Sequence, residues 1–410
     1  MYHVLKHHLS KRNSIFLVLI LLNFFFSAAL SFTIYIDSSY LVDTIGNSFY
    51  AKENSLWSDP NHVVGTVYTI GSLFTILALM IIPYLLRSVG NYRTTLVSLI
   101  LQVLILLGLG TTDSPWLIIP FFVIATMLNS IFYFNFDIFI ERYSKEEDTG
   151  KVRGLFMTFG SIAWLLPPLA AGYIVEARGY QMAYIISALL VLPCLYLTFR
   201  YLHHFKDLRY EDVSVNGTHE LVMKNKNLFN ALVVNFFIHF FYAWMVIYAP
   251  IYLHSSGLSW EEIGLMTTLA LTAFIIFPYP AGYIADRYLG EKELLIGGFT
   301  LMALSSALIP TIGIGAVSII LISLILFIGR TGASISETMS EAYYFKQIEG
   351  SQPQLVGYFR RTRPFAYVVA PILATVMLES RIITINGLFY MLAVFMILAI
   401  IPALRLKDTK

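Results

Sequence analysis

The sequence has very little cysteine and lacks the common motifs that hold nucleotides or catalytic metals. Its one cysteine, Cys194, lies in an apolar run, so neither a disulfide framework nor a thiolate metal site can form. There is no Gly-x-x-x-x-Gly-Lys-Ser/Thr loop to cradle phosphates, no His-Glu-x-x-His, and no cluster of histidine and cysteine. These absences exclude an ATP-driven pump within this chain. We therefore expect no cofactor, no metal site and no enzyme activity.

Charged residues are also scarce, at 13% of the chain, whereas 57% of the residues are hydrophobic. A soluble protein of 410 residues needs a more polar surface than this. The charges stand in short clusters between apolar runs of about 20 residues, the length that crosses a bilayer core. Such spans must be helical, because an open strand cannot satisfy its backbone hydrogen bonds in lipid. The sequence therefore predicts an all-α polytopic membrane protein with twelve transmembrane helices, at residues 14–36, 63–86, 94–111, 116–140, 154–175, 179–199, 227–252, 262–285, 293–310, 315–338, 359–378 and 385–404.

Lysine and arginine are distributed very unequally between the two sides of these spans. With the N-terminus inside, 23 of them lie in inside loops, and three, Lys52, Arg178 and Arg381, lie outside. Because cytoplasmic loops carry the excess of positive residues, the sequence predicts an even number of spans and two cytoplasmic termini. Lys11 and Arg12 precede the first apolar run as they would in a signal peptide. That run is too long for a signal peptide, so we expect it to be the first span.

The chain is expected to consist of two similar halves. A polar inside loop at residues 200–226 separates six spans from six, which predicts one bundle at 1–199 and a second at 227–410. Four short patterns recur in the same order at offsets of 200 to 212 residues: Asn23-Phe-Phe and Asn235-Phe-Phe, Arg87-x-x-Gly90 and Arg287-x-x-Gly290, Asp137-x-x-x-Glu141 and Glu337-x-x-x-Glu341, Gly154-Leu-Phe and Gly357-Tyr-Phe. Parallel six-span halves are typical of transporters that bind substrate between the halves.

The loop after span eight carries the most specific pattern in the chain. It reads Gly282-Tyr-Ile-Ala-Asp286-Arg287-Tyr-Leu-Gly290 and resembles the signature loop of the major facilitator superfamily (MFS), Gly-x-x-x-Asp-Arg-x-Gly-Arg/Lys-Arg/Lys. One extra residue separates the arginine from the second glycine, and the matching loop after span two lacks the aspartate. The resemblance extends to the span count and the two halves. It implies two pseudo-symmetric six-helix bundles, with this loop as a gating motif that latches the cytoplasmic side.

Two residues of that motif have a physical interpretation of their own. Gly282 is expected to let two helices approach closely, because it has no side chain. Asp286 is expected to sit at the N-terminus of a neighbouring helix, where a carboxylate is favoured.

Arg330 is the most informative single residue. It lies 14 residues into span ten, or about 21 Å along the helix. A charge at that depth faces a cavity or a partner, because it is costly in lipid. Arg330, Ser334 and Glu337 share one helical face. Two interpretations remain open: Arg330 binds an anionic or hydrogen-bonding part of the substrate, or it forms an internal ion pair with Glu337.

Acidic pairs recur near the cytoplasmic ends of spans four and ten, at Asp137 with Glu141 and at Glu337 with Glu341. They either bind a proton or Na⁺ during coupling, or form gate salt bridges with basic residues at the same depth, among them Arg153, Arg360 and Arg363. We favour the gate for Glu141 and Glu341. The residues Asn129, Tyr133 and Asp137 share a face that is expected to line the cavity.

His239 lies near the middle of span seven, where it either carries a proton, hydrogen-bonds a substrate, or is a buried neutral side chain bonded to another helix. The expected function is a secondary active transporter that moves a small solute by alternating access and is coupled to protons. The alternatives are a uniporter or lipid-handling member of the same fold, and a polytopic membrane enzyme or sensor. We expect a monomer in the cytoplasmic (inner) membrane, surrounded by lipid, with no nucleic-acid partner.

Overall fold

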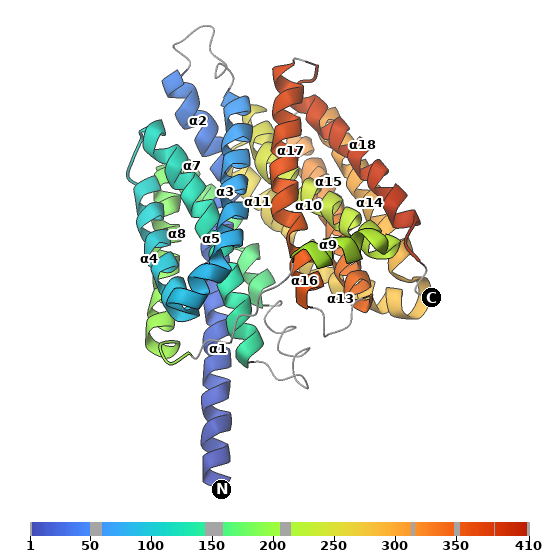
Figure 1. Ribbon diagram of the computed structural model, residues 1–410. Helices are drawn as coiled ribbons and strands as arrows, with labels where there is room; N and C mark the ends of the chain where they lie inside the picture. Colours follow the sequence, from blue (N-terminus) through green and yellow to red (C-terminus); the bar gives the residue numbers. More distant parts are fainter. Residues whose placement is uncertain are drawn as a thin grey trace. The chain divides into compact units, whose positions relative to one another are not determined.

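The computed structural model describes residues 2–49, 60–143, 159–205, 215–312, 316–347, 353–380 and 382–407, and these residues contain helices and no strand. Their packing divides them into two units (Figure 1). Unit 1 comprises Met1–Ile36 and Gly71–Glu211, and unit 2 comprises Asp37–Ile70 and Asp212–Lys410. The division expected from the sequence, with its boundary at residues 200–226, stays a prediction.

The described residues of unit 1 form a set of helices, one of which is shared with unit 2. They are α1 (Tyr2–Thr33), the part of α3 (Pro60–Val89) that begins at Gly71, α4 (Asn91–Leu109), α5 (Pro115–Tyr143), α7 (Pro167–Arg178) and α8 (Tyr180–Tyr201). Residues 159–165 before α7 are also helical, and the chain bends at Leu166 ahead of Pro167 and Pro168. The one cysteine, Cys194, is fully buried on α8, and its thiol donates to the carbonyl oxygen of Leu22 on α1 at 3.5 Å.

Unit 2 contains the remaining helices. They are α2 (Asp37–Phe49), the first residues of α3, α9 (Val215–Lys224), α10 (Lys226–Ser255), α11 (Trp260–Leu271), α12 (Ala273–Ile276), α13 (Pro278–Ile284), the π-helix η2 (Ala285–Leu289), α14 (Glu291–Leu308), the 3₁₀ turn η3 (Ile309–Thr311), α15 (Ala316–Lys346), α16 (Pro353–Arg360), α17 (Thr362–Glu379) and α18 (Ile385–Leu404).

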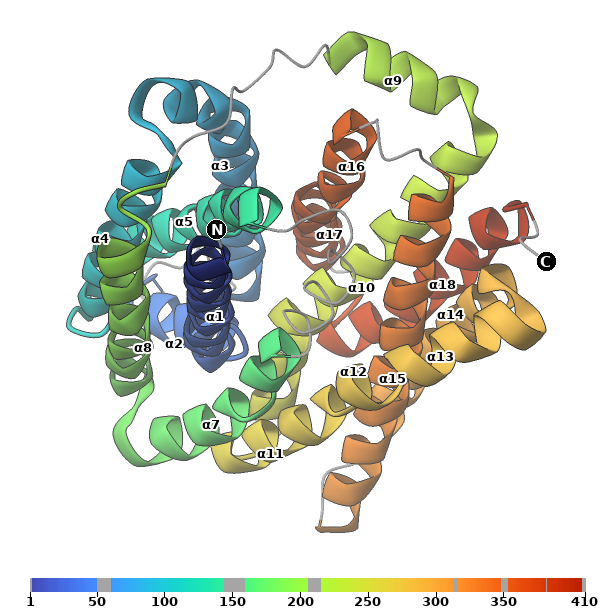
Figure 2. The same ribbon diagram turned by 90° about the horizontal axis from the view of Figure 1, so that it is seen from below.

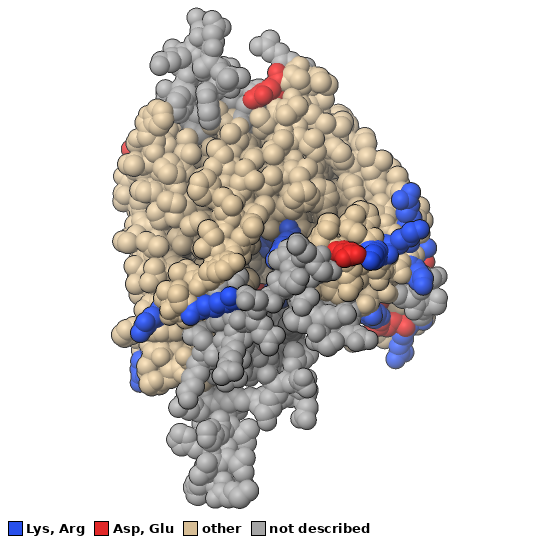
Figure 3. Space-filling model, in the orientation of Figure 1, with Lys and Arg blue, Asp and Glu red and all other residues tan. Residues whose placement is uncertain are grey.

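The twelve-span, all-α fold expected from the sequence is confirmed. Eleven helical segments among the described residues are long and apolar enough to cross a membrane. The remaining expected span corresponds to α17, whose 18 residues include Arg363 near one end and Glu379 at the other. In Figure 3, uncharged residues cover most of the described surface and the charged side chains form small groups. The chain is therefore a multi-pass membrane protein.

The same pairs of helices pack in both units, as the sequence duplication implies. The third span packs on the fourth, as α4 on α5 and α14 on α15, and the third packs on the sixth, as α4 on α8 and α14 on α18 (Figure 2). The first packs on the fifth and sixth, as α1 on α7 and α8, and α10 on α17 and α18. In unit 2, the α14–α15 contact is close, because a Cβ at Gly298 would lie 2.7 Å from the carbonyl oxygen of Gly332.

Local geometry repeats as well. Gly90 and Gly290 stand directly before α4 and α14 with φ of 88° and 93°, a conformation that favours glycine. Three residues earlier, the guanidinium of Arg87 lies 5.8 Å from the ring centre of Tyr84. In unit 2 the guanidinium of Arg287 lies 4.8 Å from the ring centre of Tyr283. The matching loop conformations support a duplicated architecture.

Two of the expected connections contain a helix, and one expected span is interrupted. The segment after span one, expected as an outside loop, begins with α2, which packs on α10 and buries Ser38 and Leu41 completely. Its serines and aspartates give it the composition of a loop, but the helix is stabilised by packing. The inside loop at 200–226 contains the helix α9. Span eight, expected over 262–285, consists of α11, α12 and α13, with interruptions at Thr272 and at Phe277, directly before Pro278.

Candidate functional site

The central helix of unit 2 is α10, and 78% of an 18-residue apolar stretch of this helix is buried inside the structure. It begins at Asn225, whose side-chain oxygen accepts hydrogen bonds from the backbone N–H groups of Asn227 and Leu228 at 3.0 and 3.3 Å. The polar side chains His239 and Tyr242 lie one turn apart on this helix, and both are half-buried. These two polar side chains therefore lie within an otherwise apolar helix bundle.

Arg330 of α15 lies beside this part of α10. Only 7% of Arg330 is exposed, and its guanidinium carbon lies 5.9 Å from the ring centre of Tyr242. Within the part of the chain that the structure describes, no side chain or carbonyl accepts a hydrogen bond from it and no carboxylate pairs with it. Arginine carries five N–H donors and a permanent positive charge. Its contact with the tyrosine ring leaves these donors without a hydrogen-bond acceptor among the described residues.

Tyr242 bridges Arg330 and Glu337. Its hydroxyl donates to Oε2 of Glu337 at 2.9 Å, while Arg330 approaches its ring. The direct ion pair between Arg330 and Glu337, one of the two interpretations that the sequence left open, is therefore not formed. The two residues are seven positions apart on α15, and the tyrosine from α10 interacts with both. We call Arg330, Tyr242 and Glu337 the tyrosine-bridged cluster.

Two more residues on unit 2 belong to the surroundings of this cluster. The ring centres of His239 and Tyr242 are 5.9 Å apart, and Nδ1 of His239 is buried without a hydrogen-bond partner among the described residues. Arg363 of α17 is close enough to interact electrostatically with both His239 and Glu337. Arg363 was expected at a cytoplasmic gate, and its placement next to the cluster links that region to Arg330.

The break in span eight lies against the same region. The hydroxyl of Ser334, one turn after Arg330, donates to the carbonyl oxygen of Ala273 at 3.3 Å. The ring of Phe274 lies 6.1 Å from that of Tyr242. Because proline has no backbone N–H, Pro278 also leaves the carbonyl of Phe274 without its usual helical donor. Broken helices near the membrane midplane commonly supply such backbone groups to a binding site.

In unit 1 the expected cavity-lining residues lie along α5. Asn129, Tyr133 and Asp137 are all half-buried. Asn129 accepts a hydrogen bond from the side-chain amide of Gln102 at 3.1 Å, and the hydroxyl of Tyr133 bonds with that of Ser27 at 3.1 Å. Asp137 also has interactions within the fold. The expectation that these three residues line a cavity stays a prediction.

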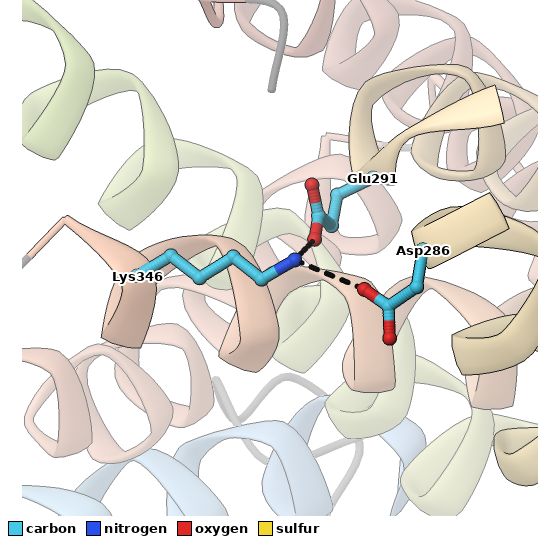
Figure 4. A network of polar contacts seen from close by, with 3 residues as sticks. All are labelled: Asp286, Glu291 and Lys346. Atoms are coloured by element: carbon cyan, nitrogen blue, oxygen red, sulfur yellow. Dashed lines mark hydrogen bonds and ion pairs between the residues drawn. The ribbon is translucent and has the colours of Figure 1, made fainter. Parts of the chain in front are cut away.

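The gating motif forms a charge network with a residue that the sequence did not single out (Figure 4). The ammonium of Lys346, at the end of α15, binds Asp286 at 3.1 Å and Glu291 at 2.5 Å. The Glu291 side chain is 2% exposed, whereas that of Asp286 is 68% exposed. The expected close helix approach at Gly282 is absent here, because a Cβ there would meet no heavy atom of the described chain within 4 Å.

Of the other expected gate residues, the structure describes the side chains of two. Glu341 is half-buried on α15, one turn beyond Glu337, and Arg360 ends α16 with an exposed side chain. Arg153 and the side chain of Glu141 lie outside the described residues. Among the residues that are described, no group of histidine, cysteine, aspartate and glutamate could hold a metal ion.

Sequence reasoning missed Tyr242, Glu291 and Lys346. Tyr242 follows His239 by three positions, so helical spacing places both side chains on the same face of span seven. Lys346 was counted as a cytoplasmic charge, and only the fold shows that it neutralises a buried carboxylate. Glu291 follows Gly290 of the motif directly, and this position could have identified it from the sequence.

Comparison with known proteins places this architecture in a family. The sequence profile described as Major Facilitator Superfamily matches residues 15–360 and 231–410, so the chain belongs to that superfamily. It is therefore a membrane transporter rather than an enzyme. A search among curated proteins found no significant match.

Solved structures show the same fold. The nucleoside transporter NupG is similar with a TM-score of 0.73 and 13% identity, over 95% of this chain and 98% of that one. An auto-inhibited POT family peptide transporter is similar with a TM-score of 0.74 and 10% identity, over 96% of this chain and 98% of that one. At these identities the likeness defines the fold and leaves the substrate open.

Proposed function

We propose that this protein is a secondary active transporter that carries a small solute by alternating access and uses a proton gradient. The observation that carries the proposal is the environment of Glu337. It lies within a membrane helix, accepts a hydrogen bond from Tyr242, and has no basic group within ion-pair distance among the described residues. A half-buried carboxylate in a membrane helix is costly when charged and lacks a basic partner, so it is suited to binding and releasing a proton.

His239 and Asp137 are the other titratable groups proposed to take part. His239 is adjacent to Tyr242 on α10, and Asp137 lies on α5 of unit 1. A uniporter of the same fold would not need any of these three groups to titrate, and this difference makes the two functions separable.

Uptake into proteoliposomes tests the proposal. A panel of labelled solutes is supplied with and without an imposed pH gradient. We expect one class of solute to accumulate with the gradient only. Glu337→Gln, His239→Gln and Asp137→Asn should each lose accumulation and keep exchange of solute across the membrane. Glu220→Gln, on the exposed surface of α9, is the matched control and should accumulate normally. Accumulation that persists in all three variants would rule out proton coupling through these groups.

We further propose that the protein is a monomer in the cytoplasmic membrane with both termini in the cytoplasm. The support for the orientation of the termini is the 23-to-3 distribution of lysine and arginine.

A further inference from the structure

We infer that the transported solute is a monoanion whose carboxylate-type group binds Arg330. The inference rests on the proposed transport function and adds the chemical class of the solute. Its starting point is Arg330, a residue that is more than nine-tenths buried and whose guanidinium has neither an ion pair nor a hydrogen bond within the described chain.

Arginine cannot relieve this situation by losing its proton. A lysine or histidine at such a position can become neutral, but the guanidinium stays charged at any physiological pH. It therefore needs an acceptor that the described fold does not supply. The obvious internal candidate, Glu337, is held by the hydroxyl of Tyr242 instead. A bound anion supplies the missing acceptor, and a carboxylate matches the planar fork of the guanidinium with two parallel hydrogen bonds.

The surrounding charges indicate a single negative charge on the solute. Arg330, Arg363 and Glu337 interact within unit 2, and together they carry one net positive charge when Glu337 is ionised. His239 and the tyrosines of the region add none when neutral. In this unprotonated state of Glu337 a monoanion balances the charge, whereas a phosphate dianion would leave one negative charge in excess. A monoanion that is carried together with one proton is an electroneutral pair.

The same surroundings indicate an apolar or aromatic body. The guanidinium carbon of Arg330 lies 5.9 Å from the ring centre of Tyr242, and the ring of Phe274 lies 6.1 Å from that of the tyrosine. A second pair of rings, Phe277 and Phe327, lies 6.0 Å apart on the break in span eight and on α15. Phe327 precedes Arg330 by three positions and therefore lies on the same side of α15. Rings on this side of the helix would pack against the body of a solute held by Arg330.

Binding measurements on the full-length purified protein test the inference. The probes are two matched series: benzoate, benzamide and phenyl phosphate, and hexanoate with hexanamide. Ligand-induced thermal shifts and titration calorimetry give the affinities at pH 8. We expect the carboxylates to bind, the neutral amides to bind at least about tenfold more weakly, and phenyl phosphate to bind more weakly than benzoate.

Variants assign the effect to Arg330. Arg330→Gln should weaken carboxylate binding by about tenfold or more, and Arg330→Lys should give an intermediate loss because it keeps the charge without the fork. The control is Arg200→Gln, in which the lost guanidinium lies 5.5 Å from the ring of Tyr201 at an exposed helix end. It should bind carboxylates as the wild type does. If Arg330→Gln does not fold, Arg330→Lys and the carboxylate-to-amide ratio in the wild type decide the question.

Three results would overturn the inference: amides that bind as tightly as carboxylates, no binding by any carboxylate, or a folded Arg330→Gln variant with wild-type affinity. The transport proposal fails differently. Carboxylates that bind but do not accumulate with a pH gradient would refute proton coupling and leave the anion site in place. Accumulation of a neutral nucleoside or sugar, without that of carboxylates, would refute the anion site and keep the transporter.

Discussion

Replacing Lys346 by methionine should destabilise unit 2 by leaving Glu291 buried without its counter-charge. The two carboxylates that Lys346 binds differ sharply in exposure, at 2% for Glu291 and 68% for Asp286. The pair with Asp286 is a surface ion pair, worth about 0.2–1 kcal/mol. Removing one partner of a buried pair costs about 3–5 kcal/mol. Because the side chain of Lys346 is 50% exposed, water partly replaces it, and we expect a loss of about 1–3 kcal/mol.

Unfolding of the purified protein in detergent measures this loss. Lys346→Met should be clearly less stable than the wild type, Asp286→Asn should lie within about 1 kcal/mol of it, and Glu291→Gln added to Lys346→Met should restore part of the stability. The double variant recovers because it no longer buries an uncompensated charge. If Asp286→Asn costs as much as Lys346→Met, or if the double variant is no more stable than Lys346→Met, then Glu291 is not the residue that requires the lysine.

Three further predictions follow from the fold. Asp286→Asn should slow transport and leave solute affinity nearly unchanged, because its partner Lys346 follows Arg330 on α15 by 16 residues, or about 24 Å; a tenfold loss of affinity at normal turnover, measured by uptake kinetics, would contradict this. Gly65→Leu should slow transport and destabilise unit 2 by about 1–3 kcal/mol. A Cβ at Gly65 would meet the hydroxyl of Thr375 and lie 2.8 Å from that of Tyr248, and Thr375→Ala should relieve part of the effect. Reporter fusions at residue 215 and at the C-terminus should both read cytoplasmic, and an external signal from either would refute the proposed topology.

The membrane spans and the duplication could be predicted because both depend on features that can be read from the sequence, namely the length of apolar runs and the recurrence of short motifs. Apolar length defines a span, and the recurrence of Arg87-x-x-Gly90 as Arg287-x-x-Gly290 reflects a loop that needs a left-handed glycine. The helix α2 was missed because its residues are polar, although packing on α10 buries them. Composition reports the average environment of a segment and gives no information about which other helix covers it.

The site was predicted only in part for a similar reason. The depth of Arg330 and its shared face with Glu337 follow from helical spacing alone. Whether the two side chains meet depends on a third residue from another helix, and the rotation of α10 relative to α15 brings Tyr242 between them. The pairing of Lys346 with Glu291 likewise joins the end of α15 to the beginning of α14. Such contacts between separate helices are fixed by packing, which a single sequence without its fold does not specify.

The burial of Cys194 makes the wild-type protein a ready background for site-directed labelling. Its thiol is fully enclosed between α8 and α1, and the sequence contains no other. A thiol reagent added to the native fold therefore meets no accessible target. A cysteine introduced beside Gly65 or Arg330 would be the single reactive position, so its rate of modification from each side of the membrane reports directly on access to that point. A spin label there would follow movement without prior removal of a native residue.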